Sequence, residues 1–145
     1  TDFNLKDTFQ NRINLIFFHS SFLFIKIKHQ KSNFKYKDFY QKMFDLIFNK
    51  IELNMREIGY GDLVINKNMK FLVKTFYNIL LNCENLSKSS QNIKKMFFSK
   101  YLTYNEEEKA DKQLLIEYFD KYQSFCFDLT IDSVLKGNLN FNYKD

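Results

Sequence analysis

The stretch FYQKMFDLIFNKIELNMREIGYGD, residues 39–62, decides the fold. Its apolar residues recur in pairs at about every fourth position, which is the spacing of one buried face of an α-helix. The pattern predicts a long amphipathic helix over residues 34–58. Gly59 ends that helix, because glycine adopts the left-handed backbone conformation without a steric penalty. Asp62 then caps a following helix through its carboxylate.

Helical spacing continues on both sides of this stretch. Residues 11–28 form a helix that is apolar on almost every side, which is typical of a central helix or of one that a partner covers. Residues 62–86 form a third helix, and a shorter one follows around 91–101. Thr103 and Glu106 have the spacing of a capping box, which starts a fifth helix that Gly137 ends. We therefore expect an all-α protein, a compact bundle of about five helices in a single domain over residues 1–145.

The composition excludes several classes of protein. The chain has 145 residues, no proline and three glycines, which excludes the turn-rich β-sandwiches and barrels. Hydrophobic residues make up 45% of it, so there is enough core material to exclude intrinsic disorder. The 18 Phe and 9 Tyr accompany abundant Lys, Asn and Ile, whose codons are rich in A and T. This bias indicates a property of the genome rather than an aromatic ligand site.

Membrane-spanning and disulfide-bonded structures are not expected. The most apolar run, residues 15–27, is shorter than the roughly 20 residues that cross a bilayer, so the protein is not integral to a membrane. Cys83 and Cys126 lie far apart on apolar helix faces and are interpreted as small buried hydrophobic residues in a reducing compartment. Because the chain begins at Thr1 rather than at Met, we expect it to be truncated or processed.

No combination of residues predicts catalysis. His19 and His29 are the only histidines, and His19 cannot form a dyad with Ser20 because adjacent helical residues point in different directions. A zinc site needs three or four ligands at suitable spacings, and none is visible. We expect no catalytic residue, no metal and no cofactor, and we place His19 in a helix–helix contact.

The turn after the long helix holds the first group of candidate binding residues. It lacks the Lys and Ser/Thr of a phosphate-binding loop and follows a helix rather than a strand, so we interpret it as a turn with two permissive glycine positions. Arg56 is one of only two arginines, and its planar guanidinium makes paired bonds that lysine cannot. It either clamps the turn through a carboxylate or carbonyl group, or binds a partner. The candidates here are Arg56, Glu57, Gly59, Tyr60, Gly61 and Asp62.

A lysine-rich segment at the end of the first helix is the second group of candidates. Its members are Lys26, Lys28, Lys31, Lys35 and Lys37. They can contact RNA or an anionic membrane surface, and the alternative is an ordinary solvated loop. DNA binding is not expected. The helices that flank Gly59 are longer than those of a usual helix–turn–helix, and the third has few side chains suited to base edges.

Two groups of residues resemble the ubiquinol–cytochrome c chaperone family, over roughly residues 7–105. The first is the run Met55-Arg56-Glu57-Ile58-Gly59-Tyr60-Gly61-Asp62-Leu63, followed by Lys67, Met69, Lys70 and Phe76-Tyr77. The second is the opening of the chain, with Asp7-Thr8-Phe9, Arg12, Leu15 and Phe18-His19. Asn78 and Ile79 stand where the family usually has Gly-Arg, and the family's residues before the opening are missing.

The resemblance implies a non-enzymatic chaperone that assists assembly of respiratory complex III. Mitochondrial members bind newly made cytochrome b, work with a small partner assembly factor and lie near the ribosomal tunnel exit. The implied location is the matrix side of the mitochondrial inner membrane, or in a bacterium the cytoplasm or the periphery of the inner membrane. Phe18, His19 and Phe22 of the apolar first helix then belong to the client-binding candidates.

Two alternatives to the chaperone remain open at this point. One is a basic helical module that associates with RNA or the ribosome through the lysine-rich segment. The other is a stable structural subunit of a larger respiratory or ribosomal assembly, in which neighbouring subunits bury the aromatic surface.

Overall fold

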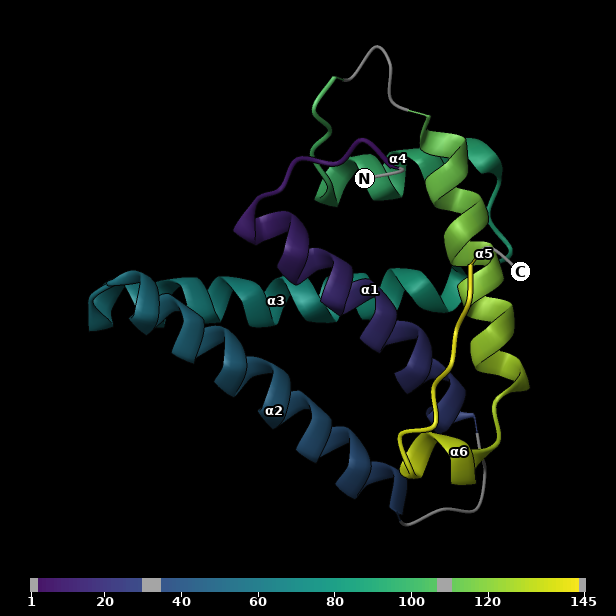
Figure 1. Cartoon of the computed structure of the whole chain (residues 1–145), viewed down its shortest axis with the longest axis horizontal. Coiled ribbons are helices and arrows are strands. Elements are labelled where there is room, and N and C mark those ends of the chain that lie inside the picture. The colour runs from purple at the N-terminus through teal and green to yellow at the C-terminus, as the bar shows by residue number, and fades with distance from the viewer. Residues whose placement is uncertain (1–2, 30–34, 107–110, 144–145) are drawn as a thin grey trace.

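The computed structural model describes residues 3–29, 35–106 and 111–143. Within these residues the chain forms six helices and no strand longer than a single bridge, which confirms the all-α prediction (Figure 1). In chain order the helices are α1 (Phe9–Lys28), α2 (Lys35–Ile58), α3 (Asp62–Leu86), α4 (Gln91–Tyr101), α5 (Lys112–Asp128) and α6 (Ile131–Leu135).

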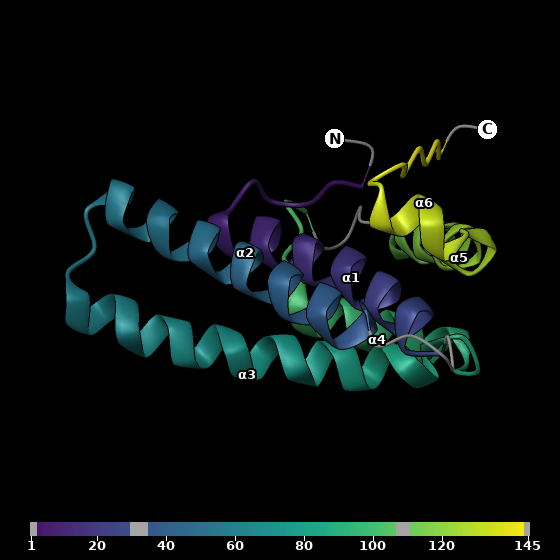
Figure 2. The ribbon, with the colours of Figure 1, turned by 90° about the horizontal axis from the view of Figure 1, so that it is seen from below.

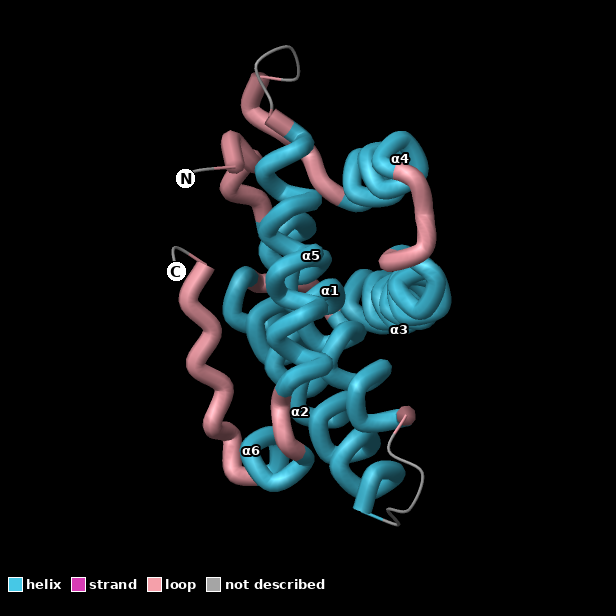
Figure 3. Tube along the Cα trace, turned by 90° about the vertical axis from the view of Figure 1, so that its right-hand side faces the viewer, coloured by secondary structure: helices cyan, strands magenta, loops and turns pink. Residues whose placement is uncertain are grey.

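The helices pack around α1. Figure 2 shows α3 on one side of the molecule and α5 and α6 on the other, with α1 between them, and Figure 3 shows α3 and α4 on the same side. Helix α1 contacts α2, α3 and α5, and α2 runs antiparallel to it (Figure 1). This central position explains why α1 is apolar on almost every side, since other helices of the same chain cover it.

The core is largely aromatic. Phe18 has no exposed surface, and its ring lies edge-on to those of Phe98 and Phe119, at 5.3 and 5.5 Å between centroids. The rings of Phe98 and Phe119 stack at 5.0 Å and join α4 to α5. Each such pair contributes about 0.5–1.5 kcal/mol beyond its burial. The abundant phenylalanines therefore supply much of the packing that holds the helices together.

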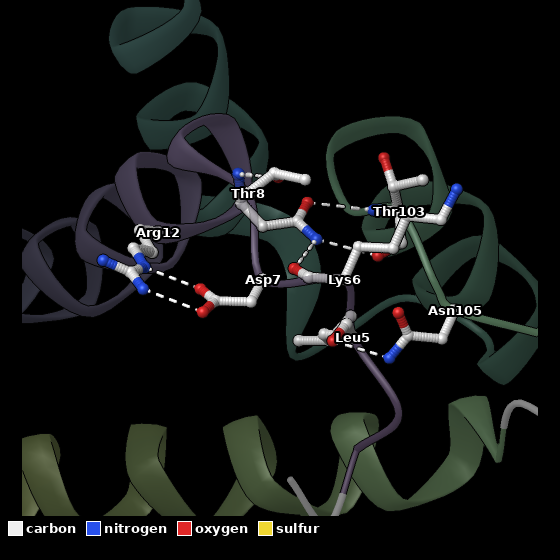
Figure 4. Close-up of polar contacts among 8 residues, drawn as sticks. Leu5, Lys6, Asp7, Thr8, Arg12, Thr103 and Asn105 are labelled. Carbon is white, nitrogen blue, oxygen red and sulfur yellow. Dashed lines mark hydrogen bonds and ion pairs between the residues drawn. The ribbon is translucent and has the colours of Figure 1, made fainter. Parts of the chain in front are cut away.

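The N-terminal segment is tied to the chain after α4. Leu5 and Tyr104 form an antiparallel bridge, and the amide of Lys6 donates to the carbonyl of Thr103 at 2.9 Å. The side-chain amide of Asn105 donates to the carbonyl of Leu5 at 3.1 Å (Figure 4). Two segments about a hundred residues apart are thereby held side by side.

Asn11 fixes this pairing from inside the protein. It is 2% exposed, and its Nδ2 donates to the carbonyls of Lys6 at 2.8 Å and Thr103 at 2.7 Å. Its Oδ1 accepts from the amide of Thr103 at 3.0 Å. One turn later, Nδ2 of Asn14 donates to the carbonyl of Tyr101 at 2.7 Å. Two buried amide side chains of α1 thus satisfy backbone groups that would otherwise lose their hydrogen bonds to water.

Two predicted boundaries are wrong, both in the fifth helix. The capping box at Thr103 and Glu106 does not form, because the N-terminal segment holds Thr103 and the helix begins only after Asp111. The Asp111 carboxylate accepts from two backbone amides of the first turn. The helix also ends well before Gly137, since the hydroxyl of Thr130 accepts from a backbone amide and starts the separate helix α6.

Two findings bear on the membrane and redox predictions. In the part of the chain that the structure describes, no helix combines the length and the apolar character needed to cross a bilayer. Cys83 and Cys126 are free and buried as predicted, and burial raises the pKa of the Cys126 thiol to about 11.

Candidate functional site

An apolar groove runs between the N-terminal half of α1 and the C-terminal half of α2. Its volume is about 630 Å³. The lining residues are Phe9, Arg12, Ile13 and Ile16 of α1 with Leu46, Ile47, Lys50, Ile51, Asn54, Glu57 and Ile58 of α2. Ile16, Leu46 and Ile58 remain 45%, 53% and 58% exposed within it. Clustered exposed apolar side chains are typical of a surface that contacts a partner.

An ion pair at the start of α1 positions the arginine of the groove. Arg12 donates from Nε and Nη2 to the two carboxylate oxygens of Asp7, at 2.7 and 2.8 Å (Figure 4). The hydrogen bond and charge of Arg12 lower the pKa of Asp7. On the α2 side, Lys50 and Glu57 are exposed and form no ion pair with another described residue. The rim of the groove therefore carries charge of both signs.

The turn after α2 ends the helix next to the groove, as predicted at Gly59. Gly59 has a φ of +103°. Its amide donates to the carbonyl of Arg56, and the amide of Tyr60 donates to that of Met55, at 3.0 and 3.1 Å. This pair of bonds is the Schellman motif, which satisfies the last carbonyls of a helix through a left-handed residue.

Arg56 clamps the turn, which was the first of the two roles predicted for it. Its Nη1 donates to Asp62 at 2.6 Å and its Nη2 to Glu52 at 3.0 Å. The hydrogen bonds to Asp62 and Glu52 both raise the pKa of Arg56, and the bond to Asp62 has the larger effect. Because Asp62 points to Arg56, it does not cap α3. Gly61 is the N-cap and makes no side-chain bond, so the predicted cap is wrong.

The second glycine of the turn has no conformational requirement, contrary to the sequence interpretation. Gly61 has a φ of −75°, which any residue adopts, and a Cβ there would meet nothing within 4 Å. Between the glycines, Tyr60 is half exposed, and Glu57 lies one turn before it at the groove. The turn thus places polar and aromatic side chains at one end of the groove.

The two glycines offer a matched test of this turn. We expect Gly59→Ala to lower the free energy of unfolding by about 1–2 kcal/mol, because alanine is strained in the left-handed region. Gly61→Ala, the control, should change the free energy of unfolding by less than about 0.5 kcal/mol, because restriction of the unfolded chain offsets the preference for glycine over alanine at an N-cap. Urea unfolding followed by circular dichroism measures both. Equal losses for the two variants would contradict the assignment.

The structure corrects the client-binding candidates of α1. Phe18 and Phe22 are 0% and 3% exposed and belong to the core, so they present no surface to a client. They were selected because α1 is apolar all round, and the helices that surround it account for that pattern. The exposed apolar residue of α1 in the groove is Ile16 instead.

His19 lies in a helix–helix contact, as predicted. Its Nδ1 lies 2.6 Å from the carbonyl of Leu15 and therefore donates to it. In the neutral ring Nε2 then accepts from the hydroxyl of Tyr118 on α5 at 2.7 Å. Burial lowers the pKa of His19 despite the bond to Leu15. No group of three or more His, Cys, Asp or Glu within the described ranges could hold a metal ion.

The lysine-rich segment is only partly available as a surface. Lys26 donates to the carbonyl of Phe127, and Lys28 pairs with Glu84 at 2.7 Å. Lys37 is exposed near the start of α2. Lys35 is the first residue of that helix, and Lys31 lies outside the described residues. Two of the five candidates therefore serve to tie α1 to α3 and to the end of α5.

The groove itself was missed at the level of sequence. Its apolar residues belong to the same repeating pattern as the core residues of α1 and α2, so periodicity marks them as buried. A signal was present in α2, where Leu46 and Leu53 fall outside the main apolar stripe. Only the packing shows which of them face a neighbouring helix and which face solvent.

Comparison with known proteins gives one match. The sequence model of the ubiquinol-cytochrome C chaperone family matches residues 1–92, which include every residue of the groove and the whole turn after α2. No curated protein and no solved structure matches the chain. Because the match covers more than half of the residues, the chain belongs to the ubiquinol-cytochrome C chaperone family.

Proposed function

We propose that this protein is an assembly chaperone of complex III that holds an apolar segment of newly made cytochrome b in the groove between α1 and α2. Family membership supports a chaperone role in this assembly. The observation that carries the choice of site is the groove, which exposes Ile16, Leu46 and Ile58 within the matched region. In this proposal the protein binds a client and catalyses no reaction.

The groove suits a client that must be held and then released. Covering apolar surface contributes about 25 cal/mol per Å² to the free energy of binding. A groove of this size covers only a short apolar stretch, so the client is held and can still dissociate. Arg12 and Lys50 carry positive charge at its rim, and Glu57 carries negative charge. These groups can bind the polar residues that flank an apolar segment and so set its direction.

The proposal includes further partners and a place in the cell. A small partner assembly factor would share the client, and a ribosome near its tunnel exit would supply it. The exposed turn at Tyr60, beside the groove, is a suitable surface for the assembly factor. The protein would then work on the matrix side of the mitochondrial inner membrane, or in a bacterium in the cytoplasm or at the inner membrane.

Two leucines of α2 provide the test. Leu46 lines the groove and Leu53 does not, although they are 53% and 48% exposed on the same helix. In cells that lack the gene, Leu46→Gln should restore less than about one tenth of the spectroscopic cytochrome b restored by the wild type, since one buried polar group costs about 1–3 kcal/mol. Leu53→Gln should restore it fully.

Capture of cytochrome b under mild detergent gives the second readout. Wild type and Leu53→Gln should retain cytochrome b, and Leu46→Gln should lose it. Capture of the assembly factor alone, lost in Leu46→Gln, would place that factor in the groove and overturn this assignment. Co-migration with mature complex III in equal amounts would show a permanent subunit instead, and an unchanged cytochrome b level in the deletion would refute the function.

A further inference from the structure

We propose that the outer surface of α3 and α4 lies against an anionic membrane. This surface is distinct from the lysine-rich segment of residues 26–37. Residues 63–101 contain one acidic residue, Glu84, which pairs with Lys28 of α1 at 2.7 Å. The same stretch carries six exposed lysines: Lys67, Lys70, Lys74, Lys88, Lys95 and Lys100.

These lysines are free to meet an external charge. None of the six forms an ion pair with a carboxylate among the described residues. The buried Lys94 is different, because it pairs with Asp120 of α5 at 2.8 Å and serves the packing of α4. The two acidic residues of α3 and α4, Asp62 and Glu84, are already paired with Arg56 and Lys28, and a surface with several unpaired cations attracts a negatively charged partner.

Exposed apolar side chains lie among these lysines. Leu63 is 87% exposed, Phe71 60% and Leu81 63% along α3, and Met96 is 73% exposed on α4. On α3, Leu63, Lys67, Lys70 and Lys74 follow each other at intervals of three or four residues, and Leu81 lies two turns after Lys74, which places all five on one side of the helix. Lysines and large apolar residues thus share the side of α3 that faces away from the core.

The two helices present one common surface. In Figure 3, α3 and α4 occupy the same side of the molecule. The buried residues of α3, such as Phe76, contact α1 and α2, and Phe98 of α4 contacts Phe119 of α5. Since these buried sides turn inward, the exposed residues of both helices face away from the rest of the bundle.

Interleaved lysines and apolar residues fit a lipid surface better than a nucleic acid. Anionic headgroups bind the ammonium groups while Leu63, Phe71 and Met96 enter the boundary between headgroups and acyl chains. Nucleic-acid bases stack on aromatic side chains, and three of the four exposed apolar residues here, Leu63, Leu81 and Met96, are not aromatic. The α1–α2 groove has no lining residue from α3 and stays open in this orientation.

The test is co-sedimentation of the full chain with vesicles of equal parts phosphatidylcholine and phosphatidylserine, and with vesicles of phosphatidylcholine alone. We expect binding to the first, weakened by salt, and little binding to the second. Lys67→Gln/Lys70→Gln/Lys74→Gln should lower the partition coefficient at least about tenfold, because each lysine near such a surface contributes about fivefold. These side chains are exposed and unpaired, so thermal unfolding should be unchanged.

Two further variants test whether vesicle binding depends on the α3–α4 surface or only on the total positive charge of the protein. Lys37→Gln/Lys42→Gln/Lys50→Gln removes the same charge from α2 and should change the partition coefficient less than about twofold. Phe71→Ser should weaken vesicle binding in high salt, where the apolar contribution remains. Equal losses in the two triple variants would overturn the proposal. Binding to poly(U) RNA that is tighter than vesicle binding, and that Phe71→Ser leaves unchanged, would also overturn it.

Discussion

Replacing Asn11 by leucine is expected to lower the free energy of unfolding by about 3–5 kcal/mol. The change removes the two bonds that Asn11 donates to the carbonyls of Lys6 and Thr103, which keep only their backbone donors. It also leaves the amide of Thr103 without its acceptor, against a side chain that is 2% exposed. A lost hydrogen bond costs about 0.5–1.5 kcal/mol, and an unsatisfied buried polar group costs about 1–3 kcal/mol. Urea unfolding followed by circular dichroism measures the loss.

Asn82 provides the control for this substitution. It also lies on a helix, but it is exposed and its Nδ2 bonds only to the carbonyl of Asn78 one turn earlier. Asn82→Leu should change stability by less than about 0.5 kcal/mol. Hydrogen exchange adds a local readout, since the amide of Thr103 should lose protection in Asn11→Leu. Retained protection there would show that Asn11 does not hold the pairing.

Phe18→Ala is expected to cost about 3–5 kcal/mol and to act on stability rather than on client binding. Phe18 is 0% exposed and lies edge-on to the rings of Phe98 and Phe119. Removing the ring leaves a cavity at the junction of α1, α4 and α5, and large-to-small changes of this kind cost that much.

Phe71 is the matched control, because it is a phenylalanine of α3 that is 60% exposed. Phe71→Ala should stay within about 0.5 kcal/mol of the wild type. The measurement is again the urea midpoint. A Phe18→Ala variant that kept its stability and lost only the capture of cytochrome b would restore Phe18 to the client surface and contradict its place in the core.

Local sequence signals predicted the middle of the chain well. The pattern of α2 gave its length, and the left-handed Gly59 followed from its position just past the last apolar residue. The clamp at Arg56 was one of the two roles expected for it, since a planar guanidinium makes paired bonds. In each case the partners lie within six residues, so the sequence contains both sides of the interaction.

One local prediction failed, because the Asp62 carboxylate binds Arg56 instead of capping α3. Other predictions failed where the partner lies far along the chain. Asn11 bonds to Thr103, 92 residues away, and this contact removes Thr103 from the helix cap that its spacing with Glu106 indicated. The groove failed for a related reason. Ile16 and Leu46 carry the same apolar character as the core, and only the packing of α1 against α2 leaves them exposed.

The pairing of Leu5 with Tyr104 has a consequence for the order in which this protein becomes complete during its own synthesis. The first segment leaves the ribosome about a hundred residues before the one it pairs with, and at typical rates this takes roughly 5–20 s. Throughout that interval Asn11 has no carbonyl of Thr103 to bond, and α5 is not yet present to cover Phe18. During its own synthesis this chain therefore leaves apolar residues uncovered, as does the nascent segment that we propose it protects.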